Sequence, residues 1–400
     1  MNNERIFHPA ATNTEVLLPG SGTLCIDSGG RAWRPFLREG LLRRVGPAEL
    51  LITWTTGGVT EPADGNVTRI ARSTDNGRTW EDAGLFRHPT RGLFTTELFC
   101  PNDGAEVHAF INTYPFGSWM TQLLSYRAIS RDGGRTWDGP HSIPGGIQNV
   151  WPNRGIKLST GAWLIPMSWA ELIGEEWAEP AHGRAPVPGQ VGARLLMQTE
   201  VPFGTDTYQR YHKGNEWADR NHRYCVGVMR SDDQGRTFGL HGHIAGGVAG
   251  HLIEPRVVEL ADGRIVMLIR SQKEGFLLRS ESRDGGLTWT PAVRTDIMNP
   301  SAKVNILKAR DGRIFLIHNP VGHQGNIMGG RNPLSLWISD DGMQTWRVKV
   351  DLVKDSRPNM SLNYPDGFLD EAAGELVFCW EDTEKLFVMR VPMEITSLNL

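Results

Sequence analysis

The chain has little of what marks several common protein classes. Its 4 cysteines among 400 residues are scattered, with no C-x-x-C pair, which disfavours a disulfide framework or a structural zinc site. No run of Lys or Arg occurs, and 42 basic against 45 acidic residues argue against a nucleic-acid partner bound by a broad basic face. The longest apolar stretches, such as Ile265–Ile269 and Leu376–Cys379, are far too short to span a bilayer. We therefore expect no metal, no cofactor and no membrane or nucleic-acid partner.

The first 18 residues also lack the basic segment and apolar run of a secretory signal peptide. A cytoplasmic location is the expectation, and secretion stays open if a leader has been removed. In contrast, glycine (46), proline (24) and tryptophan (14) are plentiful. This composition is typical of a β protein with many turns.

One pattern, Ser-x-Asp-x-Gly-x-Thr-aromatic, recurs along the chain. Its five copies begin at Ser73, Ser130, Ser231, Ser282 and Ser339, and the last has Met343 in place of glycine. The Asp side chain can accept hydrogen bonds from a tight turn, the glycine supplies a positive φ, and the aromatic ring packs beneath. The pattern therefore predicts structural hairpin turns rather than catalytic groups.

Short apolar segments form a second repeat. The six segments are Glu49–Trp54, Glu106–Ile111, Ala162–Trp169, Arg264–Arg270, Arg313–His318 and Glu375–Trp380. Each of the first five is followed by one of the turn motifs. Together they predict an all-β, six-bladed β-propeller that forms a single domain over residues 1–400, with four antiparallel strands in each blade and very little helix.

The two ends of the chain are expected to close the ring. The last blade has strands near Tyr364–Leu369, Glu375–Trp380 and Lys385–Val391 but no residues for a fourth. Thr14–Leu18 is predicted to supply it.

A long insertion separates the third apolar segment from its turn motif. Ala170–Arg220 follows the end of a second strand, so it should lie over the face that carries the functional residues. Its aromatic and imidazole residues suit a lid or a sugar subsite, and a plain packed excursion fits equally well; these residues are Trp177, Tyr208, Tyr211, His212 and Trp217.

Blade geometry selects the candidate site residues. Because strands alternate in direction, the starts of first strands, the ends of second strands and the starts of third strands share one face. Glu254 and Tyr364 fall at first-strand starts, Arg270 at a second-strand end, and Arg331 at a third-strand start, while Asp64 lies in the loop between the second and third strands of blade one.

The turn motif resembles the Asp-box, or BNR repeat, of sialidases (neuraminidases), which are six-bladed propellers. Five residues are similar to sialidase site residues in order and blade position. Glu254 resembles the sialidase Glu, and Arg270 and Arg331 resemble its second and third Arg. Tyr364 resembles its Tyr nucleophile, and Asp64 resembles its acid/base Asp. The resemblance implies a retaining exo-glycosidase that cleaves a terminal acidic sugar from a glycan. Glu61 competes with Asp64 for the acid role.

One segment departs from the sialidase pattern. Sialidases carry the first Arg of the triad in an Arg-Ile-Pro strand, but here Trp33-Arg34-Pro35 places Trp33 at that position if Pro35 keeps register. Either a bulge returns Arg34 to the site, or the triad is reduced to two arginines. Arg154, at the start of blade three, is a candidate to compensate.

Two other functions remain open. A propeller lyase or hydrolase for uronic-acid glycans would share the Arg and Tyr cleft, with Tyr364 as acid or base and no glycosyl-enzyme. A glycan-binding propeller without activity would need none of Glu254, Tyr364, Arg270 and Arg331, which disfavours it.

Overall fold

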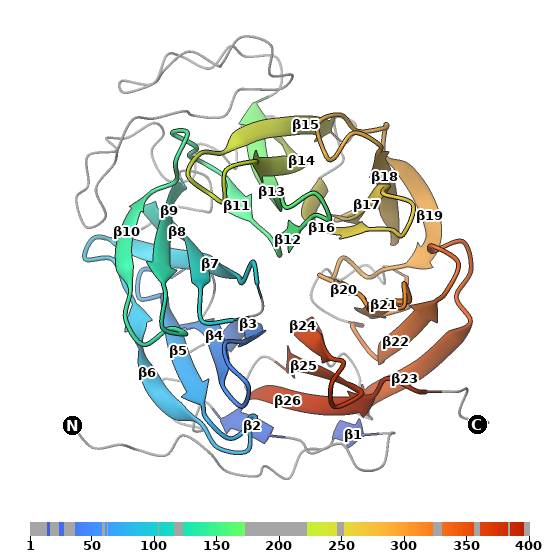
Figure 1. Ribbon diagram of the computed structural model, residues 1–400, viewed down its shortest axis with the longest axis horizontal. Helices are drawn as coiled ribbons and strands as arrows, with labels where there is room; N and C mark the ends of the chain where they lie inside the picture. Colours follow the sequence, from blue (N-terminus) through green and yellow to red (C-terminus); the bar gives the residue numbers. More distant parts are fainter. Residues whose placement is uncertain are drawn as a thin grey trace.

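The computed structural model describes residues 14–16, 24–27, 37–57, 61, 63–102, 104–115, 123–172, 222–245, 252–322, 330–355, 361–382 and 385–395. Every regular element in these ranges is a β-strand. The strands form six antiparallel sheets arranged around a central axis (Figure 1). The prediction of a six-bladed propeller is therefore confirmed.

Each blade runs from an inner strand at the axis to an outer strand at the rim. Blade one consists of β3 (Leu37–Arg44), β4 (Leu50–Thr56), β5 (Val67–Ser73) and β6 (Glu81–Phe86). Blade two consists of β7 (Arg91–Phe99), β8 (Val107–Pro115), β9 (Leu124–Ser130) and β10 (Asp138–Ser142). Blade three consists of β11 (Trp151–Pro152), β12 (Ile156–Lys157), β13 (Trp163–Leu172), β14 (His222–Ser231) and β15 (Gly239–Ala245).

The second half repeats this arrangement. Blade four consists of β16 (Leu252–Glu259), β17 (Ile265–Ser271), β18 (Phe276–Ser282) and β19 (Val293–Met298). Blade five consists of β20 (Asn305–Lys308), β21 (Ile314–His318), β22 (Leu334–Ser339) and β23 (Val348–Asp355). Blade six contains β24 (Asn363–Asp370), β25 (Glu375–Glu381) and β26 (Lys385–Pro392). The six apolar segments of the sequence are thus the second strands of the six blades.

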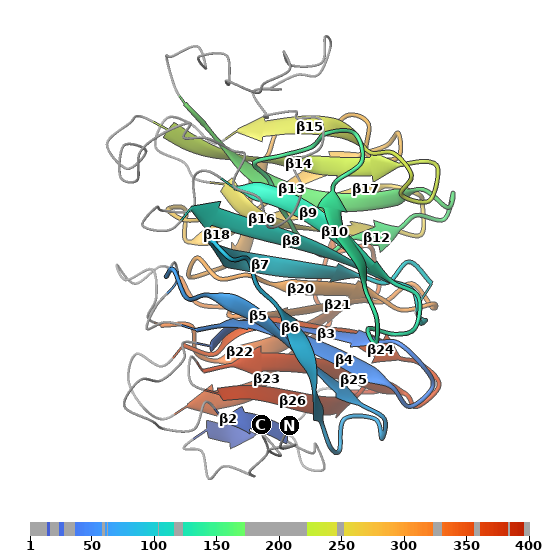
Figure 2. The ribbon, with the colours of Figure 1, turned by 90° about the vertical axis from the view of Figure 1, so that its left-hand side faces the viewer.

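The ring closes through the N-terminal part of the chain, but not through the predicted segment. β2 (Leu24–Asp27) pairs with β26 and supplies the fourth strand of blade six (Figure 2). β1 (Thr14–Val16) pairs instead with β23 as a fifth strand of blade five. The prediction that Thr14–Leu18 closes the ring was wrong, because two short strands precede blade one and the later of them reaches the free edge of β26.

The five repeated turns share one set of hydrogen bonds. In the first, the Ser73 hydroxyl donates to Asp75 at 2.8 Å and accepts from the Gly77 amide at 2.7 Å. The Thr79 hydroxyl donates to Asp75 at 2.6 Å. In the fifth turn Met343 adopts the position of glycine at φ 66° and its amide donates to the serine in the same way. Because the Ser, Asp and Thr side chains form their hydrogen bonds within the turn itself, the motif is structural in this chain.

Candidate active site

Three inner strands begin with the same irregularity. Glu39, Glu254 and Tyr364 have φ values of 57°, 49° and 47°, in the left-handed region that non-glycine residues seldom adopt. At each of them the pairing with the neighbouring strand shifts register. Such bulges re-aim a side chain, and strained backbone of this kind clusters at functional sites. The bulges bring Glu254 and Tyr364 to one mouth of the central channel.

Arg270 links these two residues. Its guanidinium is hydrogen-bonded to the Glu254 carboxylate and lies within hydrogen-bonding reach of the Tyr364 hydroxyl. Burial alone would lower the pKa of Arg270, but the charges of Glu254 and Tyr364 outweigh burial and raise it. Burial alone would raise the pKa of Glu254, and Arg270 instead holds it below its usual value. Glu254 is therefore an ionised carboxylate beside Tyr364, and the direct Glu254–Tyr364 hydrogen bond stays a prediction.

Three arginines surround the phenol ring. The guanidinium carbons of Arg38 and Arg331 lie 5.8 and 5.2 Å from the ring centroid of Tyr364, and Arg270 reaches its hydroxyl. All three guanidinium groups are buried. Arg331 donates to Asn363 at 2.8 Å and to the Ser301 carbonyl at 2.7 Å, which fixes its plane. The arrangement can hold a carboxylate from several directions at once.

The sequence interpretation missed Arg38. It is the residue before the bulged Glu39, just as Ile253 and Asn363 precede Glu254 and Tyr364. Arg34, the predicted candidate for this position, lies outside the described residues, as does Trp33. The bulge at Glu39 leaves no signal in the sequence that would have distinguished Arg38.

The loop between β4 and β5 provides a carboxyl group beside this cluster. Among the described residues no group donates a hydrogen bond to the buried Glu61 Oε1, and burial together with the charge of Glu39 raises the pKa of Glu61 to about 8. Burial alone would lower the pKa of Arg38, but nearby negative charges, Glu61 among them, raise it. Asp64, the predicted acid, is exposed at the tip of the same loop. Of the two carboxyl groups, Glu61 is the one whose charge interacts with Arg38.

Two further acidic residues lie next to Arg38. Glu381 accepts hydrogen bonds from Arg38 and from the Gly40 amide, both at 3.4 Å, and burial raises the pKa of Glu381 to about 7 although Arg38 opposes it. Glu39 accepts from the Lys303 ammonium at 2.8 Å, and this ammonium lies 5.2 Å from the Tyr364 ring centroid. Lys303 therefore adds a fourth positive charge near the phenol.

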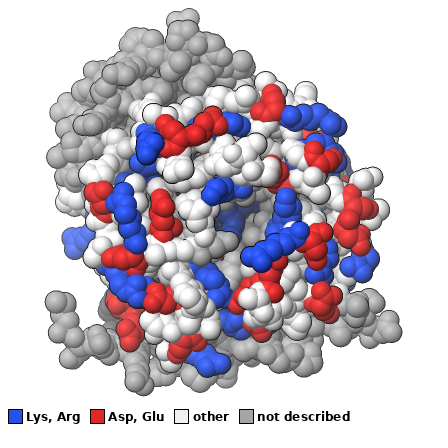
Figure 3. Space-filling view, viewed as in Figure 1, with Lys and Arg blue, Asp and Glu red and all other residues white. Residues whose placement is uncertain are grey.

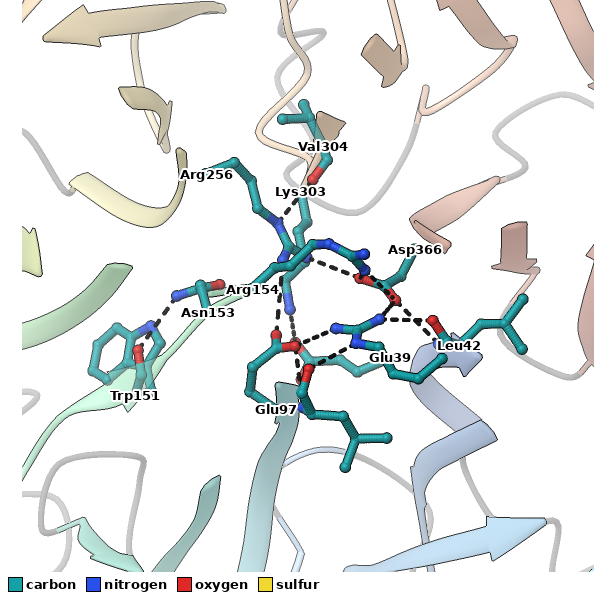
Figure 4. A network of polar contacts seen from close by, with 12 residues as sticks. Glu39, Leu42, Glu97, Trp151, Asn153, Arg154, Arg256, Lys303, Val304 and Asp366 are labelled. Atoms are coloured by element: carbon teal, nitrogen blue, oxygen red, sulfur yellow. Dashed lines mark hydrogen bonds and ion pairs between the residues drawn. The ribbon is translucent and has the colours of Figure 1, made fainter. Parts of the chain in front are cut away.

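Arg154 lies deeper in the channel than the arginine cluster. Its guanidinium contacts Asp366 at 3.3 Å, and Asp366 also binds Arg43 and approaches Arg256 at 3.7 Å (Figure 4). Arg43 and Arg256 in turn contact Glu97 at 2.5 and 3.7 Å. We call Arg43, Glu97, Arg256 and Asp366 the channel network. The predicted role of Arg154 as a substitute for the first arginine thus has no support in its position.

The predicted insertion begins and ends at the mouth that holds Tyr364. β13 ends at Leu172 and β14 begins at His222, and these two residues are paired across the strands. Residues 173–221, with all the aromatic residues singled out above, lie outside the described residues. Within the described parts of the chain, no cluster of three or more His, Cys, Asp or Glu side chains is placed to hold a metal, and no helix is long and apolar enough to cross a membrane.

Comparison with known proteins gives a consistent result. Residues 210–376 match the family described as BNR repeat-like domain. A sialidase of Bacteroides fragilis is 25% identical over 303 residues, which cover 72% of this chain and 50% of that protein. A Dyadobacter fermentans protein of unknown function has a TM-score of 0.65 at 15% identity, over 93% of this chain and 99% of that one. Trypanosoma rangeli sialidase has a TM-score of 0.62 at 15% identity, over 94% and 60%. The structural likenesses show a shared fold, and the chain spans half the length of its Bacteroides relative.

Proposed function

Because this chain belongs to the sialidase superfamily of six-bladed BNR-repeat propellers, we propose that it is a retaining exo-glycosidase that removes a terminal sialic acid from a glycan. The observation that carries the proposal is the convergence of Arg38, Arg270 and Arg331 on Tyr364. A sialic acid presents a carboxylate on the very carbon that is attacked. A clamp of guanidinium groups beside a tyrosine suits that arrangement.

The choice of nucleophile follows from charge. A carboxylate nucleophile would be repelled by the carboxylate of the sugar, whereas a neutral phenol is not. Glu254, ionised next to Arg270, is the base that would take the phenol proton as the oxygen attacks. The cations around the ring would stabilise the negative charge that develops on this oxygen.

We assign the acid role to Glu61 rather than Asp64. A general acid must hold its proton at the working pH, and a pKa of about 8 meets that requirement near neutrality. In the second half-reaction the same carboxylate would take a proton from the water that releases the sugar. Hydrolysis with retention then follows from Tyr364, Glu254 and Glu61 acting on one bond.

The direct test is product analysis with a panel of sialyl-lactoses and uronic-acid oligosaccharides. We expect free sialic acid from the sialyl-lactoses, with the released sugar formed first in the anomeric configuration of the substrate. An unsaturated uronide product would instead assign the chain to the lyases. Binding of a glycan with no product would assign it to the glycan-binding propellers.

A pH profile tests Glu61. Because the acid is active when protonated, kcat/KM for a sialyl-lactose should fall as the pH rises through about 8, the pKa of Glu61. Glu61→Gln should abolish that descending limb and lower kcat by roughly 10²–10⁴-fold. An aryl sialoside needs less help from an acid, so its loss should be much smaller. If Asp64→Asn shows this pattern and Glu61→Gln does not, the assignment is wrong.

Tyr114 is expected to position Glu61. From β8, its hydroxyl donates to the Ala63 carbonyl at 2.7 Å or to Asn66 at 2.6 Å, and accepts from the Ala63 amide at 2.9 Å. Tyr114→Phe removes these bonds and frees the loop that carries Glu61. We expect kcat for sialyl-lactose to fall roughly tenfold with KM nearly unchanged, since misplacement of an acid affects the chemical step. An equal loss with an aryl sialoside would contradict this positioning role.

A further inference from the structure

The channel has a second mouth, opposite the candidate active site. β24 has Tyr364 at one end and Asp370 at the other, and β16 likewise has Glu254 at one end and Glu259 at the other. The far ends of these strands line a cavity of about 760 Å³. This volume is in the range of sites for small molecules. Figure 3 views this face and shows a central hollow with Lys and Arg side chains on its walls.

The walls of this cavity carry more positive than negative charge. Its five cationic side chains come from blades one, three and five: Arg44, Arg154, Lys157, Lys308 and Arg310. Its three carboxylates are Glu259, Asp370 and Glu371. Five cations against three carboxylates leave an excess of two positive charges. The channel network behind the cavity does not change this excess, because it contains two cations and two carboxylates.

The carboxylates are already engaged by other groups. Asp370 is bound to Arg44, and Glu371 contacts Arg310 at 3.5 Å and accepts from its amide at 2.9 Å. Glu259 accepts from the Ser159 amide at 2.8 Å and from its hydroxyl at 2.7 Å. Asp370 and Glu371 are thus neutralised by Arg44 and Arg310, while Glu259 is held by a neutral residue. Arg154, Lys157 and Lys308 then face the single remaining carboxylate, Glu259, which preserves the excess of two positive charges.

Two of the remaining cations show this lack of compensation. Lys157 donates to Asn102, a neutral amide, at 2.7 Å. The guanidinium of Arg154 shares Asp366 with Arg43 and Arg256. Burial and then the charge of Arg43 lower the pKa of Arg154, although Asp366 opposes them. An anion in the cavity would relieve this repulsion.

We propose that this second mouth binds a phosphate dianion, either as the free ion or as the monoester of a small polar molecule such as a sugar. The two negative charges of the dianion equal the excess of two positive charges on the cavity walls. The planar guanidinium of Arg154 can donate two parallel hydrogen bonds to two oxygens of the dianion. Lys157 and Lys308 add positive charges on flexible side chains at the rim. This site is separate from the arginine cluster around Tyr364 and does not depend on the proposed glycosidase activity.

Calorimetric titration with inorganic phosphate, at an ionic strength fixed by sodium chloride, tests the proposal. We expect saturable binding at one site per chain. Each exposed charge contributes little alone, so both lysines are changed together. The double variant K157Q/K308Q should weaken phosphate binding by at least roughly fivefold. K354Q, which removes an exposed lysine of β23 outside the cavity, is the matched control and should bind as the wild type does.

The variant Arg38→Ala separates the two mouths. Phosphate binding should survive this change, because Arg38 belongs to the other mouth. A parallel titration with glucose 6-phosphate identifies the source, since saturation by either ligand supports the site and shows whether the free ion or the ester is preferred. Saturation by neither ligand would overturn the proposal. So would binding that is lost in Arg38→Ala and kept in K157Q/K308Q.

Discussion

Tyr364→Phe is expected to lower kcat for a sialyl-lactose by at least about a thousandfold, because the change removes the atom that forms the covalent bond. The melting temperature should stay within about 2 °C of wild type, since the ring still packs among Arg38, Arg331 and Lys303. Steady-state kinetics and thermal unfolding measure the two quantities. A large loss of activity without a loss of stability is the mark of a catalytic group.

Tyr126→Phe is the matched control. Tyr126 is a fully buried tyrosine on β9, outside the arginine cluster, and loss of its hydroxyl should leave kcat unchanged. Mass spectrometry with a fluorinated sialic acid that traps the intermediate gives a second measurement. The adduct should map to Tyr364 in the wild type. Full turnover by Tyr364→Phe, or an adduct on another residue, would refute the nucleophile assignment.

Arg38→Ala should lower kcat/KM for sialyl-lactose by roughly 10–200-fold. The change removes a charge-assisted contact to the substrate carboxylate, and such contacts contribute about 1.5–3 kcal/mol each. Arg38→Lys should restore only part of the loss, because an ammonium cannot hold a carboxylate through two parallel bonds. Kinetics on the sialoside and on its methyl ester, which carries no charge, separate recognition of the carboxylate from general damage.

The comparison with the ester decides the meaning of this result. In the wild type the acid should be strongly preferred, and in Arg38→Ala the preference should shrink because only the acid loses a contact. Equal losses on both substrates would show that Arg38 supports the fold rather than the substrate. If Arg34→Ala lowers kcat/KM for the acid more than Arg38→Ala does, then Arg34 rather than Arg38 is the first arginine of the triad.

Much of the fold was predictable because it depends on local chemistry. The box turns depend on side chains within eight residues of one another, and the second strands are short apolar runs with few polar interruptions. Glu254, Arg270, Arg331 and Tyr364 could be placed because their positions follow from counting strands outward from those turns. Glu254 and Tyr364 lie near the starts of β16 and β24, Arg270 lies near the end of β17, and Arg331 lies just before β22. Their contacts place all four at one mouth of the channel.

The sequence was insufficient where the local pattern of residues does not determine the position of a side chain. A bulge adds a residue without any mark in composition, so the register on Pro35 predicted Arg34, which lies outside the described residues, and did not indicate Arg38. Glu61 and Asp64 are three residues apart in one loop, and only burial distinguishes them. Arg154 follows a strand start, as a site residue should, but Asp366 holds it on the other side of the channel network.

The pairing of β2 with β26 has a consequence for how the protein is made. Leu24–Asp27 and its partner Lys385–Pro392 are far apart in the sequence, so Leu24–Asp27 leaves the ribosome long before the strand that it pairs with. The four main strands of each of blades one to five follow one another in the sequence and can assemble during synthesis, whereas blade six joins β2 to strands made much later. Tyr364 belongs to that last blade, and Arg38 begins the first. The arginine cluster is therefore complete only when blade six has formed beside blade one, so a nascent chain holds Arg38 apart from Tyr364 until that blade has been made.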